Sequence, residues 1–485
     1  MREILYREVT AQDTASVLAW LHLEWQPTIG KKVITPDGIR LQFSQDTSKR
    51  SQTIPESELS IFVWSVQRTT YLKVFRWGEQ DIREQNRIVQ QLIADLSDRF
   101  PQRYPKPPEI NLKKQSIFEA LDPYYPKTVH FFQKMPKGEY DLQRAYWWEQ
   151  RWRESVNNPQ QPKQVVFKKS EVGANGRSPS PEYDLIYIGG ALGAIHAAVM
   201  AKLGYKVLII ERLPFGRMNR EWNISRSEFQ NLIDLGLFTA QEFESLIARE
   251  YVDGFNKFFD GNLPPHLKAA VLHTPTVLNI AIASDKLLDL CGEKLRQAGG
   301  EIWDETEFIR ADIDSKQVEI QLGHLPTGEL KQVSGRLLID AMGTASPIAW
   351  QLNGKRTFDS VCPTVGAVVE GFEPEVWDAN YGDVLNSHGD ISRGRQLIWE
   401  LFPAAGEELT IYLFHYHQVH PENPGSLLEM YEDFFTILPE YRRCDMEKLV
   451  WKKPTFGYIP GHFSVGSRDR TVAFDRLLGR IGRCV

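Results

Sequence analysis

Between Tyr183 and Arg212, two short apolar runs flank a glycine turn and an alanine-rich segment. Leu185–Ile188 and Val207–Ile210 have the length and composition of buried strands, and Ala194–Leu203 has helical spacing. Strand, turn, helix and strand in this order are typical of a βαβ dinucleotide-binding unit, and Glu211 ends the second strand, where a carboxylate can accept hydrogen bonds from a ribose. The alternative is an ordinary βαβ crossover that binds no nucleotide.

The glycine turn reads Gly189-Gly190-Ala191-Leu192-Gly193, one residue shorter than the usual G-x-G-x-x-G. From Gly193 to Glu211 is 18 positions (211 − 193), close to the spacing of about 20 between turn and ribose acid. Gly190 and Gly193 therefore take the last two glycine roles, and the shortening falls in the first turn. We expect these turn residues, with Glu211 and Arg212, to bind a dinucleotide at the helix N-terminus.

Hydrophobic patterning before residue 160 predicts an aromatic-rich α+β domain. Val33–Phe43 reads as a hairpin around Asp37-Gly38, and Ile61–Trp77 as two alternating strands. Glu79–Phe100 has the apolar spacing of a long amphipathic helix, and Tyr140–Arg153 is a helical segment rich in tryptophan and arginine.

The Tyr140–Arg153 segment carries Trp147, Trp148 and Trp152 beside Arg144 and Arg151. One interpretation is a helix that docks on its own domain. The other is an interfacial contact with lipid headgroups, where tryptophan and arginine are favoured.

Composition shifts divide the chain into five parts. Residues 161–182, rich in Gln, Lys, Ser, Gly and Pro, read as a linker with a domain boundary near residue 175. The predicted parts are an N-terminal domain (1–160), this linker, a Rossmann-like nucleotide domain (183–355), a substrate-binding antiparallel sheet (356–450) and a shortened return to the nucleotide domain (451–485). The fold class is therefore α/β, with an inserted antiparallel sheet and a preceding α+β domain.

Two further segments carry candidate cofactor contacts. Arg217, Arg220 and Arg226 follow the βαβ unit and could pair with phosphate or with a flavin edge, although Ser225 also suits an N-cap for a helix beginning at Arg226. A second apolar strand runs into Asp340-Ala341-Met342-Gly343-Thr344, so Asp340, Gly343 and Thr344 are expected where ligands bind in open α/β sheets.

Candidate catalytic residues lie on a predicted hairpin formed by Leu397–Phe402 and Leu409–His415. Glu400, His415 and His417 are the titratable groups on it. A carboxyl group in an apolar pocket has a raised pKa and can act as an acid. The alternative is that all three side chains face solvent.

Charge and composition narrow the class of protein. The 485 residues are 42% hydrophobic and 25% charged, which is typical of a globular chain of two or three domains. The net charge of −6 argues against nucleic acid as a main partner. The four cysteines are scattered without metal spacing, and no apolar run is long enough to span a bilayer. Without a secretory signal at the N-terminus, the expected location is the cytoplasm.

These motifs together resemble a known family. The chain resembles the CruA-type lycopene cyclases, which are flavoproteins of phototrophic bacteria such as cyanobacteria and have CruP as a close paralogue group. The similar motifs are Y-D-x-I-x-I-G-G-x-L-G, the Glu211-Arg212 end, E-W-N-I-S-R at 221–226 and D-A-M-G-T-A-S-P at 340–347. The resemblance covers roughly residues 181 to 478. It implies bound FAD, with NADPH as a candidate reductant, and cyclisation of lycopene or another ψ-end carotene to a β- or γ-ionone end without net oxidation. An apolar substrate also implies a peripheral position on a thylakoid or plasma membrane.

The chain departs from the family pattern at two places. The strand expected to carry an acid reads I-Y-L-F-H-Y-H, so Glu400 on the partner strand is the substitute candidate. The late segment A-x-x-R-L-L-x-I-G-D-A-A is replaced by a basic ending from Ala473 to Val485 without the acid. This ending looks like a truncation, predicts weak FAD binding and puts activity in question. The alternatives are an FAD-dependent monooxygenase or isoprenoid reductase, and a non-catalytic flavin- or carotenoid-binding paralogue.

Overall fold

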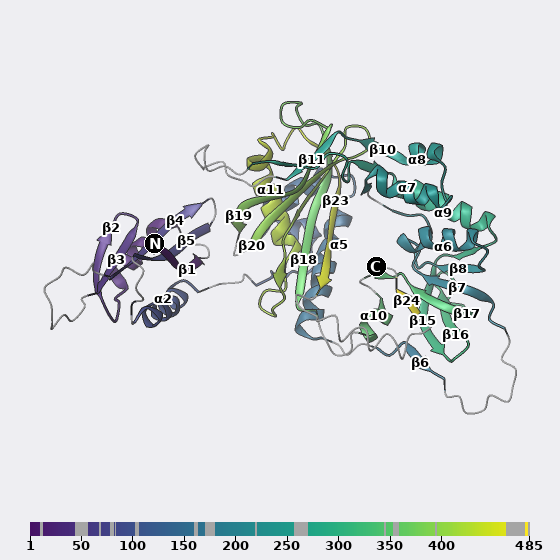
Figure 1. Ribbon diagram of the computed structural model, residues 1–485, viewed down its shortest axis with the longest axis horizontal. Helices are drawn as coiled ribbons and strands as arrows, with labels where there is room; N and C mark the ends of the chain where they lie inside the picture. Colours follow the sequence, from purple (N-terminus) through teal and green to yellow (C-terminus); the bar gives the residue numbers. More distant parts are fainter. Residues whose placement is uncertain are drawn as a thin grey trace.

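The structure is a computed structural model of the chain (Figure 1). It describes residues 1–9, 13–43, 57–66, 69–77, 82, 84–101, 106–159, 163–169, 180–218, 221–256, 270–343, 346–352, 358–392, 395–461 and 481–483. Within these ranges, no helix is both long enough and apolar enough to cross a lipid bilayer.

The N-terminal unit is a five-stranded antiparallel sheet in the order β1-β5-β4-β3-β2. Its strands are β1 (Arg2–Val9), β2 (Lys31–Thr35), β3 (Gly38–Phe43), β4 (Ser57–Val66) and β5 (Thr69–Trp77). The predicted hairpin around Asp37-Gly38 is present as β2 and β3. Lys31 pairs with Gln42 at its open end and Thr35 with Gly38 at its turn. Helices α1 (Thr14–Ala19), η1 (Trp20–Glu24) and α2 (Gln85–Arg99) contribute Val17, Leu21 and Leu92 to a core that they share with the strands.

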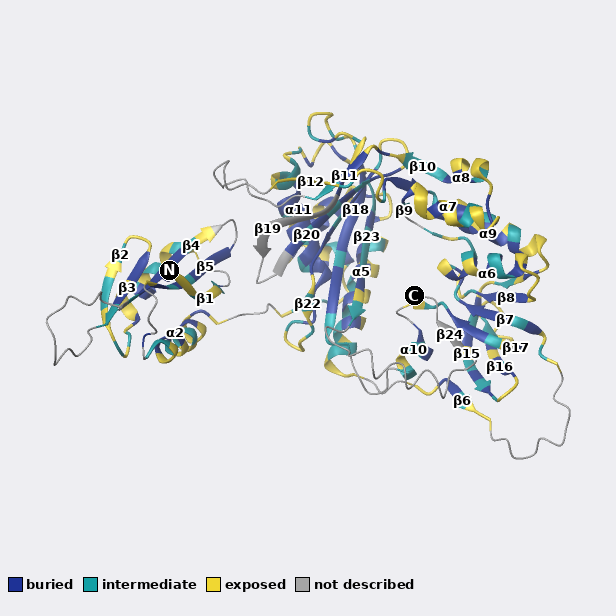
Figure 2. Ribbon diagram, in the orientation of Figure 1, coloured by how far each residue is buried: buried dark blue, intermediate teal, exposed yellow. Residues whose placement is uncertain are grey.

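The second unit is an eight-stranded sheet covered by helices. Its long antiparallel strands are β18 (Ser360–Glu370), β19 (Tyr381–Ser392), β20 (Arg395–Pro403), β21 (Leu409–Phe414) and β23 (Val450–Gly461), and its shorter strands are β11 (Asp253–Asn256), β12 (Leu272–His273) and β22 (His417–Gln418). The covering helices are α3 (Ile117–Leu121), α4 (Pro126–Gln133), α5 (Gly138–Asn157) and α11 (Leu427–Arg442). Figure 2 shows buried residues running along β18 and β20.

Residues 1–160, expected to form one domain, contribute to two separate cores. Leu142 and Trp152 of α5 belong to the same buried cluster as Trp399 and Phe434, whereas the strands before residue 78 belong to the N-terminal core. The Glu149 carboxylate fixes α5 to α11, because it accepts hydrogen bonds from Ser426 Oγ (2.9 Å) and from the Leu428 amide (3.0 Å). The segment from α3 to α5 is therefore part of the second unit.

The third unit is the predicted Rossmann-like domain. Its sheet has the order β14-β8-β7-β17-β16-β15-β6, where β14 (Glu301–Trp303), β8 (Val207–Ile210), β7 (Tyr183–Ile188) and the second half of β17 (Leu330–Asp340) run parallel. β15 (Thr306–Ile313) and β16 (Val318–His324) are antiparallel neighbours. Helices α6 (Leu192–Lys202) and α9 (Ser284–Gln297) pack on the sheet, and α10 (Pro347–Leu352) follows β17.

A small three-stranded sheet connects the second and third units. It has the order β10-β13-β9, from β10 (Ile247–Glu250), β13 (Ile280–Ile282) and β9 (Trp222–Ile224), and helices α7 (Arg226–Asp234) and α8 (Ala240–Leu246) flank it. β10 continues directly into β11 of the large antiparallel sheet. The nucleotide domain and the antiparallel sheet of the predicted fold class are therefore both present, and the sheet topology confirms that class.

The predicted boundaries shift at three points. β6 (Val166–Lys168) lies in the expected linker and pairs with β15, while residues 170–179, with the boundary near 175, lie outside the described residues. β23, placed by sequence in the return segment, pairs with β18 along its whole length. The return to the nucleotide domain is made by β24 (Ile481–Arg483), which runs parallel to the end of β17.

Candidate functional site

The glycine turn between β7 and α6 packs tightly against the turn that follows β17. Gly189 has a φ of +112°, and a Cβ there would lie 2.3 Å from the Ala341 carbonyl oxygen. A Cβ on Gly193 would be 2.8 Å from the Ala341 Cβ. Gly189 therefore provides the left-handed backbone of the turn, and Gly193 allows the close approach of helix and strand.

The N-terminus of α6 points out of this turn without a side-chain cap. Ala191 occupies the N-cap position and makes no side-chain hydrogen bond, and Leu192 in the first turn is 57% exposed. The first amides of an α-helix have no partner within the helix, and the helix dipole places partial positive charge there. This end of α6 therefore suits an anionic group such as a pyrophosphate.

Glu211 follows β8 and lies at the edge of the same turn. Its Oε2 accepts a hydrogen bond from the Gly190 amide (2.7 Å) and its Oε1 accepts one from the Leu213 amide (2.9 Å). A carboxylate has about four lone-pair sites, so acceptor capacity remains for ribose hydroxyls. The turn, the uncapped helix and a fixed carboxylate form a set that fits the adenosine diphosphate half of a dinucleotide.

Phe215 is part of this region and was missed by the sequence prediction. A Cβ on Gly190 would be 3.0 Å from the Phe215 ring, and a Cβ on Gly292 of α9 would be 2.6 Å from it. The Phe215 amide donates to Asp304 Oδ2 (3.2 Å). Gly190 and Gly292 therefore make room for an aromatic ring at the rim of the turn, a relationship that sequence spacing does not reveal.

Asp340 stabilises the second turn of the candidate cofactor site. It is 4% exposed, its Oδ1 accepts from the Met342 amide (3.1 Å), and its Oδ2 accepts from the Ser346 hydroxyl (2.5 Å). Gly343 has a φ of +64° with open space where a Cβ would lie. Asp340 thus shapes the loop that abuts Gly189, and Thr344 lies outside the described residues.

Two of the arginines expected at the cofactor, Arg212 and Arg226, lie beside carboxylates instead. Arg226 makes ion pairs with Glu244 and Glu250, both at 2.6 Å, so cofactor binding by this side chain would require those pairs to open. Arg212 lies 3.5 Å from Glu307 and is mostly exposed. Arg217 is exposed, and Arg220 is outside the described residues.

Ser225 both begins α7 and ties down a strained loop. Its amide donates to Glu228 Oε2 (2.9 Å), the contact that an N3 glutamate makes in a capping box, while its Oγ accepts from the Leu278 amide (3.0 Å). Leu278 and Thr276 have positive φ values of 51° and 64°. The E-W-N-I-S-R segment therefore holds a loop in an unfavourable backbone conformation.

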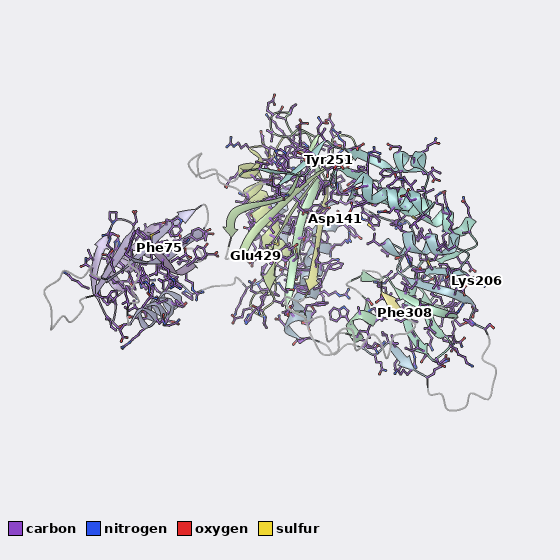
Figure 3. The ribbon with its side chains drawn as sticks, viewed as in Figure 1. Phe75, Asp141, Lys206, Tyr251, Phe308 and Glu429 are labelled. Atoms are coloured by element: carbon purple, nitrogen blue, oxygen red, sulfur yellow. The ribbon has the colours of Figure 1, made fainter. Side chains whose placement is uncertain are left out.

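Tyr251 lies where the small sheet passes into the large one, as Figure 3 shows. It is 1% exposed, its hydroxyl bonds to the Leu278 carbonyl and accepts from Asn223 Nδ2 (3.3 Å), and a Cβ on Gly382 of β19 would be 2.9 Å from its ring. Burial raises the pKa of the Tyr251 hydroxyl well above its ordinary value. Tyr251 therefore keeps its proton and connects the E-W-N-I-S-R strand to the antiparallel sheet.

On the antiparallel sheet, Glu400 points away from the covering helices. Its neighbours Trp399 and Leu401 are buried in the core beneath α11, so strand alternation turns Glu400 to the opposite face. Glu400 is paired with Tyr412 across β20 and β21, and the Phe402 and Tyr412 rings are 6.4 Å apart on this face. Burial raises the pKa of Glu400 to about 7.

The structure separates Glu400 from the two histidines. His415 is fully buried, its Nδ1 lies 3.3 Å from His417 Nδ1, and His417 Nε2 lies 3.3 Å from the Asn423 carbonyl oxygen in the loop before α11. Val361, the partner of His417 on β18, belongs to the helix-covered core, so the His417 ring and the adjoining His415 ring lie on the side opposite Glu400. The titratable groups that interact with Glu400 are instead Cys362 and Tyr416. Burial is the main cause of their raised pKa values, and the charge of Glu400 raises both further.

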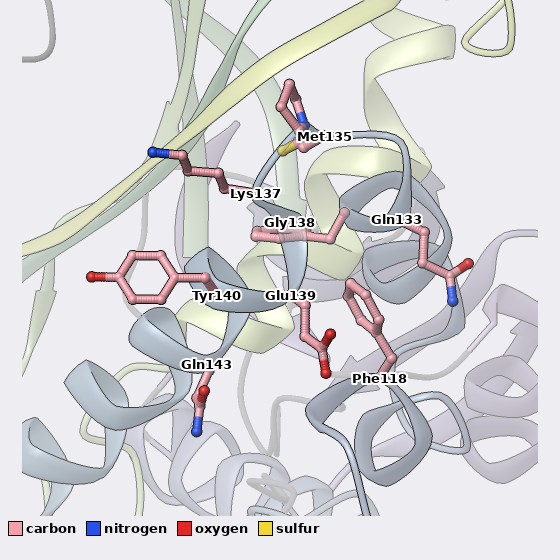
Figure 4. A pocket seen from close by; sticks show the side chains of 10 residues that line it. Phe118, Gln133, Met135, Lys137, Gly138, Glu139, Tyr140 and Gln143 are labelled. Carbon is pink, nitrogen blue, oxygen red and sulfur yellow. The ribbon is translucent and has the colours of Figure 1, made fainter.

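A pocket of about 520 Å³ lies elsewhere, between α3, α4 and the start of α5 (Figure 4). Phe118, Met135 and Tyr140 are among its lining residues, and none of the lining residues belongs to the glycine turn or to the Glu400 face. The acid that lines this pocket, Glu139, is exposed, so we do not assign the reaction to it. Across the described ranges, no group of three or more His, Cys, Asp or Glu side chains could hold a metal ion.

No family model and no curated protein sequence matches this chain. Among solved structures, it is similar to a geranylgeranyl bacteriochlorophyll reductase-like protein from Thermoplasma acidophilum (16% identity, 66% of this chain and 70% of that chain, TM-score 0.45). It is also similar to a flavoprotein/dehydrogenase from Cytophaga hutchinsonii (14% identity, 57% of this chain and 66% of that chain, TM-score 0.40). A third similar structure is aklavinone-11 hydroxylase, solved with FAD and aklavinone (13% identity, 63% of this chain and 57% of that chain, TM-score 0.43).

The described chain thus spans about two thirds or less of the length of the flavoprotein/dehydrogenase and of the hydroxylase. Flavin-dependent enzymes recur among these neighbours, including a flavin-dependent halogenase. At such TM-scores the similarity carries no conclusion about reaction or substrate.

Proposed function

We propose that this chain is an FAD-dependent lycopene cyclase, which converts the ψ-end of lycopene or a related carotene to a β- or γ-ionone ring without net oxidation. The observation that carries the proposal is Glu400, a carboxyl group on the face of the antiparallel sheet opposite α11, whose pKa is raised to about 7 by burial. A carboxyl group with this pKa retains a proton near neutral pH and can donate it to a carbon–carbon double bond.

Glu400 is the proton donor in this scheme. Protonation of the terminal double bond leaves a carbocation, ring closure moves the positive charge within the substrate, and loss of a proton restores a neutral product of unchanged mass. The ionised Glu400 and the ring faces of Tyr412 and Phe402 can stabilise the cation in an apolar setting. Tyr412 and Phe402 also offer the apolar surface that a polyene requires.

FAD is the cofactor that the nucleotide domain would hold. The uncapped N-terminus of α6 would receive the pyrophosphate, and Glu211 would accept hydrogen bonds from the adenosine ribose. When bound in its reduced form, with NADPH as a candidate reductant, the flavin supplies electron density that stabilises a nearby cation.

The test is the mass of the product formed from lycopene by the purified chain with reduced FAD under anaerobic conditions. A cyclase gives a product of unchanged mass and a shifted visible spectrum. A product with an added oxygen would indicate a monooxygenase, and one with added hydrogens a reductase. Flavin and carotenoid that remain bound without turnover would indicate a binding protein, and each of these three results contradicts the proposal.

A further inference from the structure

Helix α5 carries an exposed stripe of aromatic and arginine side chains: Tyr140, Arg144, Trp147, Trp148 and Arg151. The spacing i, i+4, i+7, i+8 and i+11 places these five residues on one side of the helix. Tyr140 is 61% exposed, Trp147 55% and Trp148 48%, and both arginines are exposed.

The opposite side of α5 is firmly docked, so the orientation of the stripe is fixed. Leu142, Ala145, Glu149 and Trp152 are buried, and Trp152 Nε1 donates to the Pro424 carbonyl oxygen at 2.5 Å. The folding of the helix is therefore accounted for by its buried side. Two adjacent, half-exposed tryptophans on the other side contribute little to this packing.

The chemistry of the stripe matches a membrane surface. Tryptophan and tyrosine favour the boundary between headgroups and acyl chains, because one end of each ring is apolar and the other can donate a hydrogen bond. Arginine pairs with anionic lipid phosphates and keeps its apolar stem against the ring faces. Arg144 already lies against aromatic rings in this way, since its guanidinium is 5.7 Å from the ring centres of both Tyr140 and Phe456.

Charge complementarity selects the class of lipid. Within the stripe the only charged groups are Arg144 and Arg151. Two acidic residues lie next to the stripe. Asp141 forms an ion pair with Arg144 at 3.5 Å. Glu154, seven residues after Trp147, accepts a hydrogen bond from Asn158 Nδ2 at 2.9 Å. We propose that the stripe docks this chain on the headgroup region of a membrane that contains anionic lipids. This proposal does not depend on the cyclase assignment.

The test is flotation of the full chain with vesicles of phosphatidylcholine alone and of equal parts phosphatidylcholine and phosphatidylglycerol. We expect the wild-type chain to float with the anionic vesicles more than with the neutral ones. The double variant Arg144→Gln/Arg151→Gln should lose about 25-fold in partitioning to anionic vesicles, at about fivefold for each arginine, and should keep its weaker partitioning to neutral ones. The double variant Trp147→Ser/Trp148→Ser should lose partitioning to both.

The matched control is Trp77→Ser, because Trp77 is 43% exposed but lies on the N-terminal sheet. This variant should float as the wild type does. Quenching of tryptophan fluorescence by brominated lipid should be stronger for the wild type than for the Trp147/Trp148 variant. The proposal is overturned if the wild type does not float, or if neither double variant changes flotation. It is also overturned if the stripe variants only dissociate a dimer in light scattering, which would make a second copy the partner.

Discussion

The Glu211 carboxylate accepts a hydrogen bond from the Gly190 amide at 2.7 Å and thereby joins the end of β8 to the glycine turn after β7. The same carboxylate accepts from the Leu213 amide, so two backbone donors fix its position. An acid held in this way needs no reorganisation to meet a ribose, and the neighbouring helix end is open to a pyrophosphate.

Replacing Glu211 should therefore weaken FAD binding without unfolding the chain. Glu211→Ala removes charge-assisted hydrogen bonds, each of which contributes roughly 1.5–3 kcal/mol, so the dissociation constant for FAD should rise by about ten- to a hundredfold. Titration followed by flavin fluorescence measures this change. Glu307→Ala is the control, because Glu307 is half exposed and lies 3.5 Å from the exposed Arg212. Equal affinities for Glu211→Ala and the wild type would rule out this ribose site.

Gly189→Ala should destabilise the nucleotide domain. The new Cβ would lie 2.3 Å from the Ala341 carbonyl oxygen at a φ of +112°, and strain plus overpacking should lower the free energy of unfolding by about 2–4 kcal/mol. Gly204→Ala is the matched control, since Gly204 has a φ of +92° but no atom within 4 Å of the new Cβ. Urea unfolding compares the two, and a smaller loss for Gly189→Ala than for Gly204→Ala would contradict the packing described here.

Glu149 should contribute strongly to the attachment of α5 to α11. Glu149→Ala leaves the mostly buried Arg153 guanidinium without its carboxylate and removes the acceptor for Ser426 and Leu428, so we expect a loss of about 3–5 kcal/mol. Glu154→Ala on the exposed side of α5 should cost well under 1 kcal/mol. Thermal unfolding measures both, and similar midpoints for the two variants would mean that the Glu149 contacts are not stabilising.

The local elements of the fold could be predicted from sequence because their signals are local. The βαβ unit, the Asp37-Gly38 hairpin and the hairpin from Leu397 to Phe414 depend on periodicity and on turn residues close in the chain. α5 is a docked helix, but it docks on the second unit and not on the N-terminal domain to which the sequence assigned it. The lipid contact of its other side stays a prediction.

The arrangement of these elements could not be predicted in the same way. Glu149 and Ser426 are 277 positions apart, and nothing local in either segment indicates the other. Glu400 and His415 seemed to share a site because they lie on one hairpin. The register of β20 and β21 instead pairs Glu400 with Tyr412, and the histidines turn toward the loop before α11. Phe215 at the glycine turn depends on space left by Gly292, which lies 77 positions away (292 − 215).

Burial of Glu400 should make stability depend on pH. Its pKa is about 7 in the folded chain against an ordinary 4.5, so the folded state binds more protons than the unfolded state between these values. The free energy of unfolding should therefore fall as pH rises from 4.5 to 7, by up to about 3 kcal/mol, and level off above 7. Glu400→Gln should lack this contribution. Urea unfolding at a series of pH values tests it, and parallel pH profiles for the two proteins would disprove it.

The most direct test of the central claim is cyclisation of lycopene by Glu400→Gln, with FAD binding measured on the same sample. Glutamine keeps the shape of the side chain but cannot donate the proton, so cyclised product should fall by at least about a hundredfold while FAD affinity stays unchanged. Glu407→Gln, in the exposed turn of the same hairpin, should cyclise as the wild type does. Undiminished cyclisation by Glu400→Gln would show that another group supplies the proton.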